Sequence, residues 1–177
     1  VISEKPMAIS SKDCEEMIAA CRNARKKLSI GYRLRFDPFN KEMMRLGQQK
    51  VYGRPVQILC ANGFVYKDDP NAWRLKKDMA GGGGLMDMGI YCIQAARYVT
   101  GEEPAYVTAT EEKTRPEIFK EVDETVHFDL EFPSGCIAKG TSSFNLDLSS
   151  LQVKAEKGEF GLSHAYWYSG EEGNTPA

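Results

Sequence analysis

ETVHFDLEFPSGCIAKGTSSF, residues 124–144, is the stretch that decides the fold. Its apolar side chains at Val126, Phe128, Leu130 and Phe132 alternate with polar or charged ones. A period of two with one apolar face predicts a strand that is buried on one side. The PSG that follows is a turn, and residues 136–144 predict a second strand that pairs with the first. The stretch therefore predicts an antiparallel hairpin.

The surrounding sequence extends this hairpin into a sheet. RPVQILCANGF (54–64) and PAYVTATEE (104–112) read as further strands, and LQVKAEKGEFGLS (151–163) reads as another hairpin, closed at Lys157-Gly158. Helical spacing predicts a short helix over 39–49 and a longer one over 83–99 that stops at Gly101. We expect an open, predominantly antiparallel sheet with helices on one face.

The first part of the chain has a different pattern. Val1 and Ile2 resemble the end of a buried strand, and residues 11–27 predict a helix capped by Ser10 or Ser11. LSIGYRLRF (28–36) alternates and predicts a strand. Strand, helix and strand make a βαβ unit of a parallel sheet. The fold class is therefore α+β: the open sheet of residues 37–177 follows a βαβ remnant of a doubly wound Rossmann sheet, residues 1–36.

Composition excludes several functional classes. The net charge of −2, with both signs interspersed, gives no reason to expect nucleic acid as a partner. Apolar runs fall far short of the roughly 20 residues that span a bilayer, and no leader opens the chain, so we expect no membrane and a cytoplasmic protein. Five cysteines without a CxxC pair, and two isolated histidines, predict neither disulfides nor a metal site. We expect the cysteines to be small buried hydrophobic residues.

A run of four glycines precedes the longer predicted helix in MAGGGGLMDMGIY (79–91). Without Cβ atoms, residues 82–84 can adopt positive φ and lie close to a flat ligand or a neighbouring helix. Asp87 and Tyr91 follow at a spacing of four, which places both side chains on one helix face. An acid beside a phenol can transfer a proton. A flexible loop, a helix-capping Asp87 and a Tyr91 that only packs would explain the same residues.

Lys5, in SEKPM, follows the carboxyl end of the first predicted strand, where open parallel sheets bind ligands. A loop lysine is more often a solvated surface charge. Together with Asp87 and Tyr91, however, it makes three proton-handling groups. Such groups suit the removal of a proton from an alcohol while a hydride leaves its carbon.

Four motifs in order resemble the Gfo/Idh/MocA oxidoreductase family, and within it the glucose-fructose oxidoreductase-like members. They are SEKPM, IGYRLRFDP, NAWRLKKDMAGGGGLMDMGIY and RYVTGEEP. The resemblance implies a Rossmann domain that binds NAD(P), followed by a domain whose open sheet binds substrate and mediates oligomerisation. It implies hydride transfer between a sugar or polyol hydroxyl carbon and a nicotinamide cofactor, with NADP favoured over NAD.

The resemblance also implies roles for single residues. Lys5 would contact substrate and nicotinamide, and Pro6 would follow a cis peptide bond. Asp87 would hold sugar hydroxyls, and Tyr91 would relay the proton to the substrate oxygen. Lys5, Asp87 and Tyr91 are therefore the predicted catalytic residues.

The predicted cofactor-binding residues include Lys5 and Pro6 and four more. By resemblance, Tyr32 and Arg33 lie near the cofactor, and Trp73 and Arg74 cover its nicotinamide end. No metal is expected. We further expect a homodimer or homotetramer through the open sheet, because one helix cannot cover the apolar face of residues 126–130.

The sequence departs from the family pattern in two ways. It has no G-x-G-x-x-G phosphate-binding turn, and it ends after EEGNTPA (171–177) without the usual closing helix. We therefore expect a fragment that is inactive alone. Two alternatives stay open: a non-catalytic NAD(P)-binding sensor or regulator of the same fold, and a free-standing sheet module for dimerisation.

Overall fold

The computed structural model describes residues 1–67 and 69–166, and its main element is a six-stranded sheet in the order β4-β5-β6-β3-β7-β8. Neighbouring strands are antiparallel except β3 and β6, which run parallel in the middle. The predicted open, predominantly antiparallel sheet is confirmed. Residues 171–177, on which the expected lack of a closing helix rests, lie outside the described residues. The strands are β3 (Pro55–Gly63), β4 (Tyr106–Glu112), β5 (Thr125–Glu131), β6 (Ile137–Ser143), β7 (Leu148–Ala155) and β8 (Gly158–Ser163).

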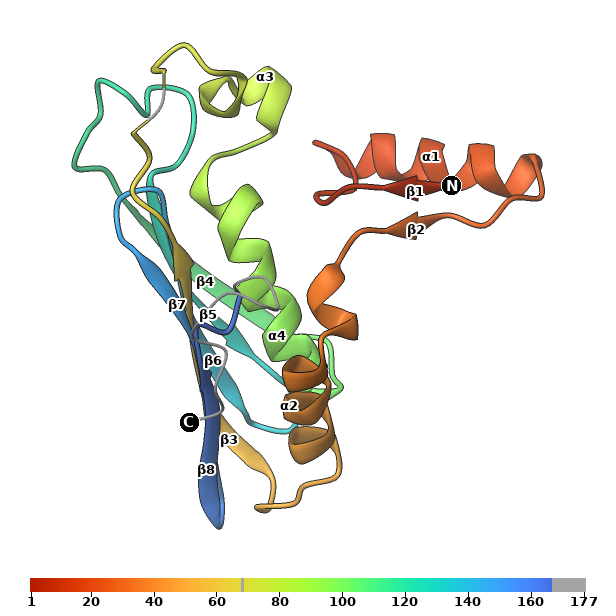
Figure 1. Ribbon diagram of the computed structural model, residues 1–177, viewed down its shortest axis with the longest axis vertical. Coiled ribbons are helices and arrows are strands. Elements are labelled where there is room, and N and C mark those ends of the chain that lie inside the picture. The colour runs from red at the N-terminus through yellow and green to blue at the C-terminus, as the bar shows by residue number, and fades with distance from the viewer. Residues whose placement is uncertain (68, 167–177) are drawn as a thin grey trace.

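Two helices, α2 (Pro38–Gln48) and α4 (Ile90–Thr100), lie on the same face of this sheet (Figure 1). They approach each other closely at Gly47, where a Cβ atom would lie 2.3 Å from the carbonyl oxygen of Val99. As predicted, α4 stops at Gly101, whose φ of +70° suits a residue without a side chain. The helices therefore form a second layer over one side of the sheet.

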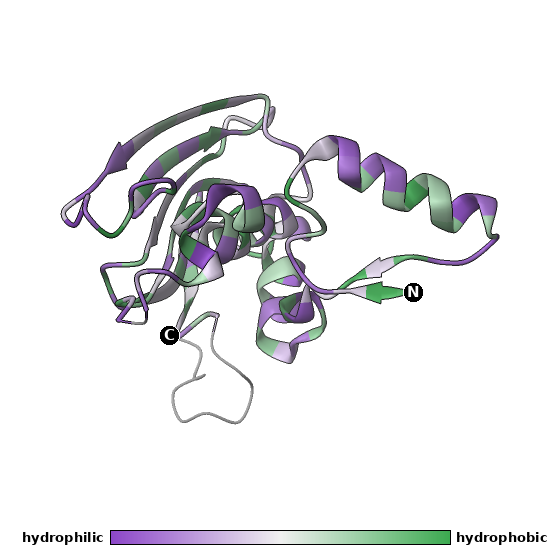
Figure 2. Ribbon diagram, turned by 90° about the horizontal axis from the view of Figure 1, so that it is seen from above, coloured by the Kyte–Doolittle hydropathy of each residue, from purple (hydrophilic) through white to green (hydrophobic). Residues whose placement is uncertain are grey.

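The βαβ unit stands beside the sheet (Figures 1 and 2). It consists of β1 (Ile2–Ser3), α1 (Ser11–Asn23) and β2 (Ser29–Ile30), and the two short strands run parallel. The Ser10 hydroxyl caps α1 by accepting the amide proton of Asp13 at 3.2 Å. The predicted βαβ arrangement and its helix cap are confirmed, but the helix ends at Asn23 rather than at residue 27, and Ile2 in the strand predicted to be buried is 84% exposed.

The predicted strand over 28–36 is wrong beyond Ile30. The chain turns there into a short 3₁₀ helix, η1 (Arg33–Phe36). The reason is local, because the Asp37 carboxylate accepts two backbone amides in the first turn of α2 and so fixes the start of that helix directly after η1. The alternation did not reflect one buried face, since Leu34 is buried while Phe36 is 70% exposed.

The apolar face of Val126, Phe128 and Leu130 is covered inside the chain, by two helices rather than by a second copy. All three are at most 6% exposed and belong to the core that α2 and α4 share with the sheet. Room for the Phe128 ring comes from Gly140 on β6, where a Cβ atom would lie 2.1 Å from the ring. Any contact with a second copy must therefore use other residues.

The five cysteines all carry free thiols. Cys60, Cys92 and Cys136 are buried, as predicted, whereas Cys14 and Cys21 on α1 are partly exposed. Burial raises the pKa of Cys136 to about 11, so this thiol stays protonated at neutral pH. The buried cysteines therefore act as small packing residues.

A second, smaller core is largely aromatic. It joins the segments 64–75 and 118–122 to Phe144 after β6, and its ring centroids lie 5.2 to 6.3 Å apart. Such separations are typical of packed aromatic pairs. The buried residues of this cluster are Tyr66, Leu75, Phe119, Val122 and Phe144.

A buried ion pair secures the aromatic cluster. The fully buried carboxylate of Glu124 accepts hydrogen bonds from the Arg115 side chain at 2.8 Å and from the Thr114 and Arg115 backbone amides. Arg115 also donates to the carbonyl oxygens of Tyr66 at 2.9 Å and Phe144 at 2.7 Å. Burial by itself raises the pKa of Glu124, but the hydrogen bonds from Arg115 and Thr114 outweigh it and hold the pKa below its usual range.

Among residues 1–67 and 69–166, none of the helices combines the length and apolarity that a membrane crossing requires. In the same part of the chain, no three His, Cys, Asp or Glu side chains gather where they could hold a metal ion.

We predict that Glu124→Gln lowers the free energy of unfolding by about 3 kcal/mol at neutral pH, because it leaves the Arg115 guanidinium without its buried counter-charge. The folded-state pKa of Glu124 lies below the reference value of 4.5, so its contribution is present above that value and is lost as the pH falls through the folded pKa. Urea denaturation of both proteins should therefore show a difference that shrinks as the pH falls below about 4.5.

The matched control for this prediction is Glu156→Gln, which alters the exposed Arg54–Glu156 pair at 3.2 Å. Solvent screens such a pair, so its loss should be much smaller. Equal losses in the two variants, or a pH-independent difference for Glu124→Gln, would contradict the prediction.

Candidate active site

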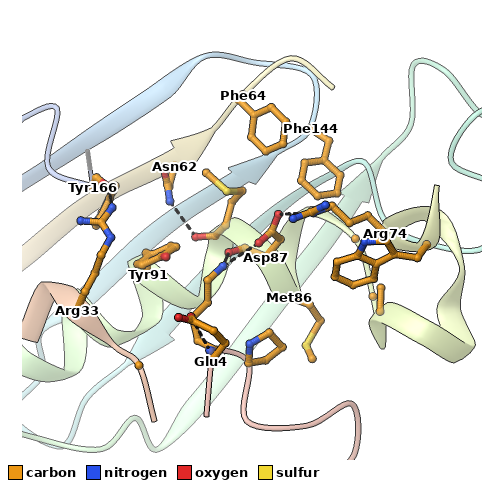
Figure 3. Close-up of a pocket in the computed structure, with 18 residues that line it drawn as sticks. Glu4, Arg33, Asn62, Phe64, Arg74, Met86, Asp87, Tyr91, Phe144 and Tyr166 are labelled. Atoms are coloured by element: carbon orange, nitrogen blue, oxygen red, sulfur yellow. Dashed lines mark hydrogen bonds and ion pairs between the residues drawn. The ribbon is translucent and has the colours of Figure 1, made fainter. Parts of the chain in front are cut away.

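A cavity of about 800 Å³ lies between the βαβ unit, the glycine turn of residues 81–84 and the end of β3 (Figure 3). Lys5, Asp87 and Tyr91, the three residues predicted to be catalytic, all line it. They come from the turn after β1 and from the helical segment after the glycine turn. The fold thus brings together side chains that are more than 80 residues apart in sequence.

Lys5 is held by two oxygens of one residue. Its ammonium donates to the Asp87 carbonyl oxygen at 2.6 Å and to Asp87 Oδ1 at 2.7 Å. The Lys5 side chain is only 12% exposed, so these bonds replace most of its hydration. Pro6 also lines the cavity, and the Lys5–Pro6 peptide bond is cis, as the resemblance implies.

Asp87 lies in a π-helical turn, η3 (Leu85–Gly89), which continues into α4. Two carbonyl oxygens of this turn accept bonds from side chains outside the helix: that of Asp87 from Lys5, and that of Met88 from Asn62 on β3 at 3.2 Å. Single π-helical turns occur frequently at functional sites. The longer predicted helix therefore exists, but its first turn is wider than an α-helical one.

Tyr91 lies one turn further on and packs against Tyr166, with ring centroids 6.2 Å apart. The Lys5 ammonium lies 4.7 Å from the centroid of the Tyr91 ring, within the range of a cation–π contact. The predicted face shared by Asp87 and Tyr91 is thus present (Figure 3), and Lys5 contacts both residues.

The glycine turn is tight for a reason other than the one expected. Of residues 81–84, only Gly81 has positive φ, at +77°. A Cβ atom on Gly83 would lie 2.0 Å from the carbonyl oxygen of Asp123, and one on Gly84 would lie 2.8 Å from that of Glu124. The missing side chains therefore allow a close approach to the chain before β5, while Gly82 and Gly83 also line the cavity.

Trp73 and Arg74, in the short helix η2 (Trp73–Leu75), form another part of the wall. The Arg74 guanidinium lies 4.6 Å from the Trp73 ring centroid, and its Nε is 3.7 Å from Asp87 Oδ2. Asp87 therefore faces two cations. The next helix, α3 (Lys77–Ala80), leads into the glycine turn.

Arg33 and Tyr32 point to different places. Arg33 lines the cavity, and its Nη2 donates to the Tyr166 carbonyl oxygen at 2.7 Å. Tyr32 does not line the cavity but faces a small separate space with Gln94 and Tyr98. Burial raises the pKa of Tyr32, and a hydrogen bond with Gln94 offsets part of this effect. The structure thus brings together every predicted site residue except Tyr32.

Among the wall residues that sequence reasoning missed, those with polar side chains are Glu4, Asn62 and Tyr166. Asn62 had a readable signal, because it is a polar residue on the face of β3 that Ile58 and Cys60 bury. Tyr166 had none, since it lies after the last strand and reaches the cavity only through the fold. Burial raises the pKa of Tyr166, so its phenol stays neutral.

Both a family model and single known proteins match most of this chain. The family model described as "GFO/IDH/MocA C-terminal domain" matches residues 41–161. The D-xylose 1-dehydrogenase [NADP(+)] of Haloarcula marismortui is 28% identical over 171 residues, 94% of this chain and 48% of that protein. The trans-1,2-dihydrobenzene-1,2-diol dehydrogenase of Xenopus laevis is 36% identical over 134 residues, 75% of this chain and 38% of that protein.

Among solved structures, the chain is similar to the aldose-aldose oxidoreductase of Caulobacter crescentus, solved in complex with glycerol. The TM-score is 0.92 with 42% identity, over 100% of this chain and 54% of that one. The chain thus spans about half the length of the relatives it matches.

We predict that Lys5→Met lowers the free energy of unfolding by about 1–2 kcal/mol, because it removes two charge-assisted hydrogen bonds and leaves the Asp87 carboxylate without its nearest cation. Urea denaturation followed by circular dichroism measures this change. The matched control is Lys12→Met, which removes an exposed ion pair with Glu16 at 3.9 Å. Its loss should be smaller, and equal losses would show that Lys5 contributes no more than a surface charge.

Proposed function

The chain belongs to the Gfo/Idh/MocA family, and on that premise we propose that the whole protein is an NAD(P)-dependent oxidoreductase acting on a sugar or polyol hydroxyl. The observation that carries the proposal is the convergence of Lys5, Asp87 and Tyr91 in one cavity. The relatives named as sugar dehydrogenases and as an aldose-aldose oxidoreductase support the substrate class. Residues 1–36 would belong to the cofactor-binding Rossmann domain and residues 37–177 to the domain that binds substrate.

The cavity wall fits a nicotinamide cofactor in its chemistry. Three cationic side chains, Lys5, Arg33 and Arg74, face two acidic ones, Glu4 and Asp87, which leaves a net positive wall for an anionic ligand. Lys5 and Arg33, with Pro6, Trp73 and Arg74, would hold the nicotinamide end. The cofactor supplies the hydride acceptor or donor. NADP is favoured over NAD because a relative that covers most of this chain is named for NADP(+).

The chain's own residues would manage the proton. When a hydroxyl carbon is oxidised, its oxygen must lose a proton, and Tyr91 would take up that proton as a phenolate, which becomes the neutral phenol. The Lys5 ammonium, which lies over the Tyr91 ring, would stabilise the phenolate before the transfer and the negative charge that develops on the substrate oxygen. Asp87 orients Lys5 through two bonds and has a second oxygen for a sugar hydroxyl.

The direct test is turnover by the whole protein. Aldoses and polyols are supplied with NADP or NAD, and the absorbance of the reduced nicotinamide is followed. Reduction that depends on the sugar supports the proposal. Cofactor binding without turnover for any sugar or polyol would instead identify a sensor of the same fold.

We predict that Tyr91→Phe lowers kcat by roughly 10²-fold while cofactor affinity barely changes, because the ring stays and only the proton carrier is lost. Steady-state kinetics and cofactor titration measure the two quantities. Tyr98→Phe is the matched control, since Tyr98 lies on the same helix but does not line the cavity that holds Lys5 and Asp87. Turnover of Tyr91→Phe at the parental rate would show that Tyr91 is not the proton relay.

We also propose that two copies meet through the outer face of the sheet, as a homodimer or within a homotetramer. The exposed apolar residues there are Leu59, 47% exposed, Ile137, 39%, and Tyr106, 71%. They lie among polar groups such as the Asp129–Lys139 pair, so the face mixes apolar and charged contacts. The five free thiols suit a reducing compartment, and we place the protein in the cytoplasm.

The prediction for this assembly is that Leu59→Asp shifts the whole protein toward monomer in sedimentation velocity, because a charge would be buried at the apolar part of the interface. Val51→Asp is the matched control, since Val51 is also 47% exposed but lies between α2 and β3. A parental protein that stays monomeric at high concentration, or a Leu59→Asp variant that assembles normally, would contradict the interface.

A further inference from the structure

Asp123, just before β5, binds the glycine turn with most of its polar atoms. Its carboxylate accepts the amide protons of Gly83 at 2.7 Å and Leu85 at 2.6 Å, one on each oxygen. Its carbonyl oxygen accepts the amide proton of Gly84 at 3.2 Å. Three successive amides of the turn, 40 residues away in sequence, are thus fixed by one residue. Asp123 does not line the cavity.

The path from Asp123 to the proposed catalytic groups is short and continuous. The carbonyl oxygen of Gly83 accepts the amide proton of Asp87 at 3.1 Å. Asp87 in turn presents its carbonyl oxygen and Oδ1 to the Lys5 ammonium. A shift of the glycine turn would therefore move both oxygens that hold Lys5.

The surroundings leave the turn little room to adjust. A Cβ atom on Gly83 would lie 2.0 Å from the Asp123 carbonyl oxygen, which is far inside van der Waals contact. At the far end of the π-helical turn, a Cβ atom on Gly89 would lie 2.9 Å from Ser142 Cβ on β6. The segment from Gly83 to Gly89 is thus packed against the residue before β5 at its start and against β6 at its end. Asp123 supplies the hydrogen bonds that fix the first residues of this segment.

We propose that Asp123 is a positioning residue: it fixes the glycine turn so that Asp87 presents two oxygens to Lys5. The proposal rests on the proposed function, since the groups it positions are the proton-handling groups of that reaction. The negative charge of Asp123 matters to this role. Each carboxylate oxygen accepts one amide proton, whereas the amide of Asn would turn an N–H toward one of them.

The test is the Asp123→Asn variant of the whole protein. We expect kcat for sugar oxidation to fall by about 10²-fold, the effect of a misplacement of about 1 Å, while the dissociation constant of the cofactor stays the same. Gly83→Ala should give the same pattern by a different route, because its methyl group would push the turn away from Asp123.

Asp37→Asn is the matched control. The Asp37 carboxylate also accepts two backbone amides, those of Phe39 and Asn40 at 3.0 Å, but it caps α2 and does not line the cavity. The control should keep its kcat, and because the side-chain oxygen of Asn can still accept both amide protons, it should lose little thermal stability. Unchanged kcat in Asp123→Asn, or a fall in kcat that Asp37→Asn shares at an equal loss of melting temperature, would overturn the proposal.

A second readout separates this proposal from the proposed function. In nuclear magnetic resonance, the side-chain ammonium of Lys5 should give a hydrogen-bonded signal that Asp123→Asn weakens and Asp37→Asn leaves intact. Amide exchange at Gly83 and Leu85 should become faster only in Asp123→Asn. If the parental protein turns over no sugar or polyol, the proposed function fails, and these signals still decide: their change supports the positioning role, and their constancy overturns it.

Discussion

The ammonium of Lys5, held by two oxygens of Asp87, is the contact on which the rest of the site depends. A cation that is only 12% exposed has lost most of its water, so it is stable there only while both oxygens stay in place. Because Lys5 follows β1 and Asp87 precedes α4, the same contact also joins the βαβ unit to the sheet domain. The same two hydrogen bonds therefore hold the βαβ unit against the segment before α4 and hold the Lys5 ammonium at the cavity.

The segment that carries Asp87 is held against the sheet from both ends. Before it, the glycine turn lies directly on the backbone of residues 123–124. After it, Asn62 on β3 donates to the Met88 carbonyl oxygen, and Gly89 lets the helix approach Ser142 on β6. A wider π-helical turn between these supports directs carbonyl oxygens toward side chains rather than only along the helix. Close backbone approach therefore explains the glycines better than flexibility does.

Sequence patterns correctly predicted the elements that bury one face and whose limits are set by residues nearby in the sequence. The alternation in residues 124–144 worked because β5 and β6 bury one face, and the glycine after α4 marked its end. The same alternation failed in 28–36, since the helix start at Asp37 determined the local conformation and no partner strand continued there. Neither the bond from Asp123 to the glycine turn nor the Arg115–Glu124 pair has a local signature. Lys5, Asp87 and Tyr91 were found through their motifs, but their mutual distances required the structure.

The cavity is built from two sets of residues with different supports. Lys5, Asp87 and Tyr91 depend on the glycine turn and on α4. Phe64, Trp73 and Arg74 come instead from the segment whose aromatic cluster Arg115 secures through the carbonyl oxygens of Tyr66 and Phe144. The buried Glu124 carboxylate neutralises Arg115. The two sets meet at Arg74, whose Nε lies 3.7 Å from Asp87 Oδ2, so a change in residues 64–75 leaves the surroundings of the Lys5–Asp87 contact unaltered only while Arg74 keeps its place.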